Sequence, residues 1–262
     1  MGLIDTHCHL TFAPLADDVD QVIRRSVAAG VNGWITVGTD LDHSERAMAL
    51  AERVPNLFVA VGLHPHQAGE ATDEGLDRLA RLAKGGSVVA IGETGLDLHH
   101  LHCPIEDQKR VFIWHLELAA RLGLPLVVHC RDAFDQTVEI LDRYRDLAGR
   151  TVFHCFSGTA AQARAAIDRG FHLSFSGVVT FKNAPDVQEA ARNSPLDRVL
   201  IETDCPYLSP EPVRRQKTNE PALMAHTVRF VAALRGMDLG PFAEAVTGNA
   251  RRFFRLSQFY PV

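Results

Sequence analysis

Six scattered residues of this chain are of the types that bind divalent metal ions and activate water. Four are histidines and two are carboxylates, and each closes a short apolar stretch. Neutral imidazoles bind Zn²⁺ and other first-row divalent ions, and carboxylates extend the range toward Mn²⁺ and Mg²⁺. The six residues are His7, His9, Glu93, His129, His154 and Asp204. Together they are typical of a hydrolytic metal site.

The spacing of the first two histidines indicates the structure that presents them. His7 and His9 are two positions apart, so on an extended strand both side chains point to the same side, whereas a helix would turn them apart. A lone His-x-His pair is a weak signal, because a single histidine is more often a core or surface side chain bonded to its neighbours. All six residues fall at the ends of candidate strands, which favours one shared site.

Eight short segments rich in Val, Ile and Leu are the predicted strands. They are mostly apolar throughout, as expected of strands buried on both faces. They cover residues 3–6, 33–37, 57–62, 88–92, 125–128, 151–153, 171–175 and 199–203. Helical stretches lie between them, and one apolar stripe runs from Val111 to Leu122 before Gly123. This alternation predicts an α/β fold, a single (β/α)8 TIM barrel domain spanning residues 1–262.

The carboxyl ends of barrel strands meet at one mouth, where catalytic residues lie. Glu93 ends the fourth predicted strand and could bridge two ions roughly 3.5 to 4 Å apart, although a lone ion would also fit. Asp204, after the eighth, could bind metal and accept a proton from metal-bound water. Glu93 and Asp204 are therefore the expected catalytic residues. Glu202, two positions earlier, either orients ligands or pairs its charge within the barrel.

Other residues near the mouth are predicted to contact a substrate. His64 follows the third strand, and Arg131 could bind two oxygens of a phosphate. Ser157 follows His154 and either binds an oxyanion or forms a plain turn. The local histidine-rich stretch 99–102 is expected to be a flexible exposed loop.

Composition narrows the class of protein. Hydrophobic residues make up 46% and charged residues 23% of the chain, which excludes disordered and collagen-like proteins. The five cysteines lack Cys-x-x-Cys spacing and are expected to be reduced. Four of them directly follow a residue of the six, so strand alternation would turn them away from the mouth. These are Cys8, Cys130, Cys155 and Cys205.

The sequence also bears on location and partners. No signal peptide and no segment apolar enough to span a bilayer is apparent, so a cytoplasmic protein without membrane attachment is expected. No obligate protein partner is evident. The net charge of -5 gives no global attraction to nucleic acid, so any contact with a polyanion must come from local groups.

Seven motifs, in order along nearly the whole chain, resemble the TatD family of metal-dependent deoxyribonucleases within the amidohydrolase superfamily. They occupy residues 5–9, 62–66, 91–97, 129–132, 154–158, 201–208 and 219–221. The resemblance implies a barrel, a site for one or two ions, and phosphodiester hydrolysis, often as an exonuclease acting on DNA ends. It implies that the six residues bind metal and that Asp204 is the proton acceptor.

The same resemblance implies supporting or substrate-binding roles for His64, Glu202 and Arg131. Asn219, in the proline-rich loop 205–221, is placed with Ser157 at this substrate rim. The chain departs from the family pattern at the rim. Leu-His-His follows Gly-Leu-Asp where the family often has an aromatic residue, and residues 215–218 read Arg-Gln-Lys-Thr instead of Arg-Gly-Lys-Arg.

The sequence therefore predicts a metal-dependent DNase or phosphodiesterase, an exonuclease that hydrolyses DNA by a metal-activated water. One or two divalent ions among Mg, Mn, Zn and Ni are the expected cofactors. An alternative is an amidohydrolase-type hydrolase of a small amide, lactone or ester, which the net negative charge mildly favours. A binding protein with a vestigial site is disfavoured, because such a site should have lost a ligand.

Overall fold

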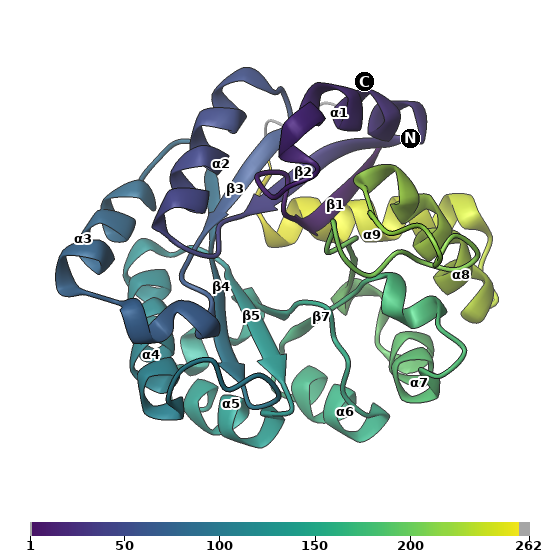
Figure 1. Ribbon diagram of the computed structural model, residues 1–262. Helices are drawn as coiled ribbons and strands as arrows, with labels where there is room; N and C mark the ends of the chain where they lie inside the picture. The colour runs from purple at the N-terminus through teal and green to yellow at the C-terminus, as the bar shows by residue number, and fades with distance from the viewer. Residues whose placement is uncertain (1, 257–262) are drawn as a thin grey trace.

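Eight parallel strands form one continuous sheet in chain order, wrapped into a nearly closed barrel (Figure 1). The computed structural model describes residues 2–256. The strands are β1 Leu3–Cys8, β2 Val31–Val37, β3 Leu57–Val61, β4 Val88–Asp97, β5 Leu126–Arg131, β6 Thr151–Phe153, β7 His172–Phe175 and β8 Val199–Ile201. The predicted (β/α)8 architecture is confirmed.

Helices cover the outside of the barrel (Figure 1). They are α1 Val19–Ala28, α2 Leu41–Arg53, α3 Asp73–Leu82, α4 Ile105–Leu122, α5 Phe134–Leu141, α6 Ala160–Asp168, α7 Pro185–Asn193, α8 Met224–Leu234 and α9 Leu239–Phe253. The predicted stripe of α4 is buried at Phe112, Leu116 and Ala119. The helix ends at Gly123, whose φ of 69° is the left-handed conformation that glycine adopts without steric cost.

Three strands run further at their carboxyl ends than the sequence predicted. β1 ends at Cys8 instead of residue 6, β4 ends at Asp97 instead of residue 92, and β5 ends at Arg131 instead of residue 128. The added residues include His7, Glu93 and Asp97, which are polar yet 3% exposed or less. The prediction followed apolar runs and stopped where polar residues began. Those polar residues remain in strands because their side chains face one another at the mouth.

The interior of the barrel is apolar at the end opposite the mouth. The side chains packed there come from the strands and from the segment that ends α9. They include Ile4, Ile35, Ala60, Ala90, Val127, Val152, Leu200, Phe253, Phe254 and Leu256. A larger cluster fills the space between the strands and the surrounding helices. One end of the barrel is thus a packed hydrophobic core, and the other is left for polar side chains.

The seam between β1 and β8 closes through residues that follow β8. The backbone N–H of Asp204 donates to the carbonyl of His7 at 2.9 Å, and the N–H of His9 donates to the carbonyl of Cys205 at 2.8 Å. The fully buried carboxyl of Asp5 accepts bonds from the N–H and hydroxyl of Thr203, at 2.9 and 2.5 Å. Burial raises the pKa of Asp5 to about 7, against these bonds, which lower it.

Two further predictions concern the bounds of the domain and the absence of membrane-spanning helices. The predicted domain of residues 1–262 includes residues 1 and 257–262, which lie outside the described residues. Within residues 2–256, none of the helices combines the length and the apolar character needed to cross a membrane.

Substitution of Asp5 tests the seam. Asp5→Ala leaves the buried N–H and hydroxyl of Thr203 without their acceptor, so we expect the free energy of unfolding to fall by about 3 kcal/mol in urea denaturation. Asp5→Asn keeps an acceptor oxygen of similar shape and should lose only about 1 kcal/mol. Equal stability of Asp5→Ala and the parent protein would contradict this account of the closure.

Candidate metal centre

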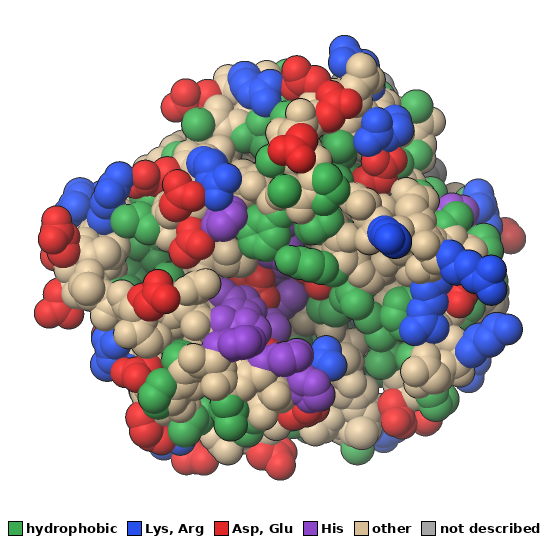
Figure 2. All heavy atoms as spheres, viewed as in Figure 1, with side chains coloured by type: hydrophobic (Ala, Val, Ile, Leu, Met, Phe, Trp, Pro, Cys, Tyr) green, Lys and Arg blue, Asp and Glu red, His purple; other side chains and the backbone are tan. Residues whose placement is uncertain are grey.

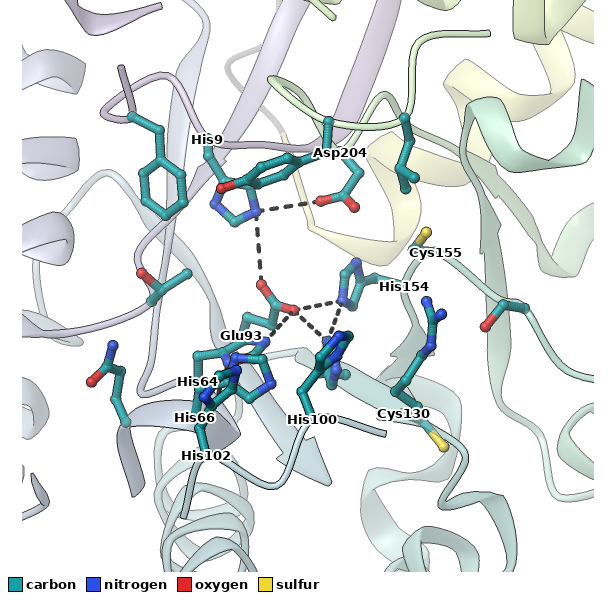
Figure 3. A pocket seen from close by; sticks show the side chains of 18 residues that line it. His9, His64, His66, Glu93, His100, His102, Cys130, His154, Cys155 and Asp204 are labelled. Atoms are coloured by element: carbon teal, nitrogen blue, oxygen red, sulfur yellow. Dashed lines mark hydrogen bonds and ion pairs between the residues drawn. The ribbon is translucent and has the colours of Figure 1, made fainter. Parts of the chain in front are cut away.

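A cavity of about 530 Å³ opens at the carboxyl ends of the strands. Figure 2 shows histidine side chains gathered with carboxylates in a hollow on this face. Five of the six predicted residues line the cavity, and His7 is fully buried in contact with them. The five are His9, Glu93, His129, His154 and Asp204, and Figure 3 labels four of them, His9, Glu93, His154 and Asp204. The structure therefore brings all six together.

The two oxygens of Glu93 face two different groups of side chains. Oε2 lies 3.4 Å from Nε2 of His7 and 3.8 Å from Nε2 of His9. Oδ1 of Asp204 lies 3.7 and 3.4 Å from the same two nitrogens. This first group is built from β1, β4 and the segment after β8.

The second group surrounds the other oxygen. Oε1 of Glu93 lies 2.8 Å from Nδ1 of His129 and 2.7 Å from Nε2 of His154. Nε2 of His64 is 3.4 Å from the same oxygen. Glu93 thus stands between the groups, where its carboxylate could be shared by two ions. His64, predicted to contact substrate, is therefore as close to Oε1 of Glu93 as His7 is to Oε2.

The chemistry of these atoms fits divalent ions. Nε2 of His7 and Nε2 of His9 face each other at 3.2 Å, and Nδ1 of His7 is buried without a hydrogen-bond partner. Two trios of ligand atoms are each close enough together to hold an ion. One is His7, His9 and Asp204, and the other is His64, Glu93 and His129. Imidazole and carboxylate are ligands that Zn²⁺ and Mn²⁺ accept.

The electrostatics keep the two predicted catalytic carboxylates ionised. Burial raises the pKa of Glu93, but the neighbouring histidines, His154 first among them, hold it well below its usual range. Burial also raises the pKa of Asp204, but the hydrogen bond with His9 and the charges of nearby histidines outweigh burial and lower the pKa. Burial is the largest influence on His7, and together with the charge of His154 it lowers the pKa of that histidine. Both carboxylates are therefore available as anionic ligands at neutral pH.

Two further carboxylates hold histidines of the centre from behind. Oε1 of Glu202 accepts the N–H of Cys155 at 2.6 Å and lies 3.5 Å from Nδ1 of His154, within ion-pair distance but without a hydrogen bond. Oδ2 of Asp97 lies 3.0 Å from Nε2 of His129. A carboxylate on the far nitrogen fixes the orientation of a ligating imidazole and raises its basicity. Of the two readings open for Glu202, its position favours the orienting one.

Sequence reasoning gave no role to Asp97. The signal was present, because Asp97 lies four positions after Glu93 and alternation on an extended strand places both on one side. The prediction ended this strand at residue 92, so the periodicity was not followed. Gly95 lies between them with φ of 142°, and a Cβ there would collide with the carbonyl of His129. Glycine is required where β4 and β5 approach so closely.

The predicted rim residues divide into two kinds. Arg131 and Ser157 are exposed and border the cavity. Asn219 is fully buried and is not among the residues that line it. Its amide donates to the carbonyl of Thr203 at 3.0 Å and to the carbonyl of Tyr207 at 2.6 Å. Asn219 therefore fastens the loop that follows β8.

Some side chains lie nearer the cavity than the sequence predicted. Cys130 and Cys155 line it, although alternation was expected to turn them away. For Cys155 the reason is that β6 has ended and the residue has a left-handed φ of 42°, so the alternation no longer holds. Cys8 and Cys205 are fully buried. His100 and His102, expected in an exposed loop, also line the cavity.

Two aromatic side chains at the mouth were not predicted. Phe12 and Tyr207 border the cavity with ring centroids 6.5 Å apart, and Tyr207 is 54% exposed. An exposed aromatic residue beside a polar cavity offers a flat apolar surface to a ligand. Neither residue belongs to a periodic pattern that would have identified it in the sequence.

A buried histidine outside the centre supports the segment that carries His64. The N–H of Leu63 donates to Nε2 of His115 at 3.0 Å. Nδ1 of His115 lies 2.7 Å from the carbonyl of Val111 and must carry the proton that it donates there. This pattern requires the neutral imidazole, and burial lowers the pKa of His115 to about 4.

The barrel and the centre at its mouth define a hydrolase of the kind that places histidine and carboxylate ligands at strand ends. Residues 4–255 match the model of the family described as TatD related DNase. The chain belongs to this family, as the motifs predicted.

Individual relatives agree with this assignment. The chain is 40% identical over 255 residues to the metal-dependent hydrolase YabD of Bacillus subtilis, covering 97% of this chain and 100% of YabD. It is 35% identical over 258 residues to the 3'-5' ssDNA/RNA exonuclease TatD of Salmonella typhimurium, with 97% and 99% covered. The solved structure of YJJV, a TatD homologue from Escherichia coli K12, matches with a TM-score of 0.92 and 31% identity over 97% of this chain and 98% of that one.

His115 predicts a pH dependence of stability. Its pKa is about 4 in the folded protein and 6.5 as the ordinary value, so between these values the unfolded chain binds more protons. The contribution to stability is complete above about pH 6.5 and is lost as the pH falls toward about 4. We expect the free energy of unfolding to fall by about 2 kcal/mol from this histidine when the pH is lowered from about 7.5 to about 5.

The measurement compares the parent protein with His115→Gln. Urea unfolding at both pH values should show a smaller loss for the variant, because glutamine does not titrate while its side chain can still accept the N–H of Leu63. The other histidines titrate in both proteins and cancel in the comparison. Identical losses in the two proteins would refute the role given to His115.

Proposed function

We propose that this chain is a metal-dependent nuclease that hydrolyses phosphodiester bonds of DNA from the strand end. One or two divalent ions would be held by His7, His9, Glu93, His129, His154 and Asp204. The observation that carries the proposal is the position of Glu93, whose two oxygens face two separate groups of nitrogen and oxygen donors. The exonuclease activity in the name of the Salmonella relative supports the substrate class.

The charge of the site is consistent with a cation-dependent reaction on phosphate. Glu93, Asp97, Glu202 and Asp204 lie at or behind the cavity, and these carboxylates alone would repel a phosphodiester. Divalent ions, when bound there, reverse the local charge, polarise a phosphoryl oxygen and lower the pKa of bound water. The histidine-rich donor set suits Zn, Mn or Ni, and the carboxylates also admit Mg.

The residues of the chain then have distinct tasks. Asp204 is ionised and lies at the cavity wall, where its carboxylate accepts a proton from the attacking water. Asp97 bonds the ring of His129 and holds it in orientation, and the carboxylate of Glu202 lies 3.5 Å from Nδ1 of His154.

Rim side chains would bind the nucleic acid. Arg131 and Ser157 border the cavity and can donate hydrogen bonds to phosphate oxygens. Phe12 and Tyr207 also border the cavity and offer aromatic faces on which unpaired bases can stack. A site of this kind favours single-stranded ends, since stacked bases inside a duplex are not accessible to such rings.

Asp204→Asn tests the proton acceptor. Asp204 has a left-handed φ of 57°, which asparagine also tolerates, so the variant keeps the backbone while losing the carboxylate. We expect kcat on end-labelled single-stranded DNA to fall by about 10²- to 10⁴-fold. Asp132→Asn is the matched control, because Asp132 has φ of 55° and stands outside the six residues. Full activity in Asp204→Asn, or an equal loss in the control, would overturn the assignment.

Glu93→Ala tests the shared carboxylate. Loss of both oxygens separates the two groups of donors, so we expect nuclease activity to be abolished and bound metal to decrease, with the barrel still folded by circular dichroism. Full activity of the purified variant would exclude Glu93 from the mechanism.

Metal removal tests cofactor and substrate together. Chelation should abolish hydrolysis of single-stranded DNA, and reconstitution with Mg²⁺, Mn²⁺, Zn²⁺ or Ni²⁺ separately should identify the ions that restore it. A parallel panel of small amides, lactones and esters tests the alternative substrate class. Turnover of that panel without turnover of DNA would replace the nuclease proposal, and activity that survives chelation would contradict both.

A further inference from the structure

A second cluster of potential ligands lies beside the centre. His66, Asp97 and His100 each offer one atom, and these three atoms lie within 4.8 Å of one another. Nε2 of His66 is 3.0 Å from Oδ2 of Asp97, and Nδ1 of His100 is 3.9 Å from the same oxygen. The ring of His102 lies 4.4 Å from that of His66, centroid to centroid. Figure 3 shows these histidines together on one side of the cavity.

We propose that His66, Asp97 and His100 form an additional site for a transition-metal ion such as Zn²⁺, with His102 beside it. None of these residues is among the six of the centre, although Oδ2 of Asp97 also lies 3.0 Å from Nε2 of His129, and the site does not depend on the proposed substrate. Tetrahedral zinc with bonds of 2.0 to 2.1 Å places its ligand atoms about 3.3 Å apart. The observed separations require only small side-chain shifts to meet that geometry.

The carboxylate of Asp97 is fixed in place for this role. Its Oδ1 accepts the N–H groups of His99 and His100 at 2.9 and 2.7 Å. The amide of Gln108 bonds both the N–H and the carbonyl of Asp97. Oδ2 is left for side chains, and nitrogens of His66 and His129 lie 3.0 Å from it. Charge and position are therefore set before any ion arrives.

The two chain segments that supply the ligands are tied together. His66 lies in the short 3₁₀ segment Pro65–Glu70, and His100 lies in the loop after β4. The thiol of Cys103 donates to the carbonyl of Pro65 at 3.0 Å, and Gln108 donates to the carbonyl of Cys103 at 3.3 Å. These bonds align the loop with the segment, so the cost of ordering the ligands is partly met before metal binds.

Burial indicates an open site. The side chain of Asp97 is 3% exposed, whereas those of His66 and His100 are 27% and 53% exposed. Three protein ligands on one side leave room for water to complete the coordination. We expect an exchangeable ion here, which would add positive charge to the wall of the cavity that His66 and His100 line.

The test is metal content. Protein equilibrated with excess Zn²⁺ and freed of unbound metal is measured by elemental analysis. We expect His66→Ala/His100→Ala to contain one equivalent less than the parent protein. His99→Ala is the matched control, because His99 lies in the same loop but its Nδ1 contacts Asp132 at 2.9 Å. The control should retain the parent stoichiometry.

A conservative variant separates ligation from a structural effect. His100→Asp supplies a ligand oxygen and should retain the additional equivalent, whereas His100→Ala should bind that ion at least tenfold more weakly in a Zn²⁺ titration. Thermal unfolding of each variant verifies that the barrel is intact.

Unchanged stoichiometry in the double variant would overturn the proposal, as would an equal loss in His99→Ala. A Glu93→Ala background keeps this test distinct from the proposed function. We expect a bound ion that His100→Ala removes in that background even when nuclease activity is absent. Failure to find it there, with stoichiometry unaffected by His100, would exclude the additional site while leaving the main centre untouched.

Discussion

The seam between the first and last strands is the constraint on which the site depends. The N–H of Asp204 donates to the carbonyl of His7, and the N–H of His9 donates to the carbonyl of Cys205. These bonds fix the register of residues 7 to 9 against residues 204 and 205, so that Oδ1 of Asp204 comes within 3.4 Å of Nε2 of His9. Asp5 and Thr203 reinforce the same seam one layer deeper. A shift of register by one residue would turn the two histidines away from the cavity.

The barrel divides its interior between stability and chemistry. The end opposite the mouth is filled with apolar side chains, including Phe253 and Phe254 from the end of α9. The mouth buries carboxylates and imidazoles, which are costly to remove from water unless they pair or bind ions. Glu93 and Asp204 remain charged because histidines surround them. The hydrophobic end offsets the cost of holding this polar cluster in place.

The sequence predicted the architecture and the six central residues because both depend on simple periodicities. Apolar runs identified every strand, and His7 and His9 two positions apart identified a shared face. Asp97 was missed because strand prediction stopped at the first polar residues, although β4 continues through them. His115 and Asn219 illustrate a different limit. Their roles depend on contacts with Leu63 and Tyr207, which are distant in sequence or outside regular elements. No local pattern encodes such contacts.

The chain order of the ligands has a consequence for synthesis. The first ligands stand at residues 7 and 9, and the last stands at residue 204, so the centre joins segments that are far apart in the chain. During translation the first histidines leave the ribosome long before their partner aspartate exists. The complete donor set forms only when the last strand closes against the first, which is a contact of very long sequence separation. A nascent or truncated chain that lacks β8 and Asp204 therefore cannot carry the finished set of donors, and incomplete copies of this protein should lack the proposed activity.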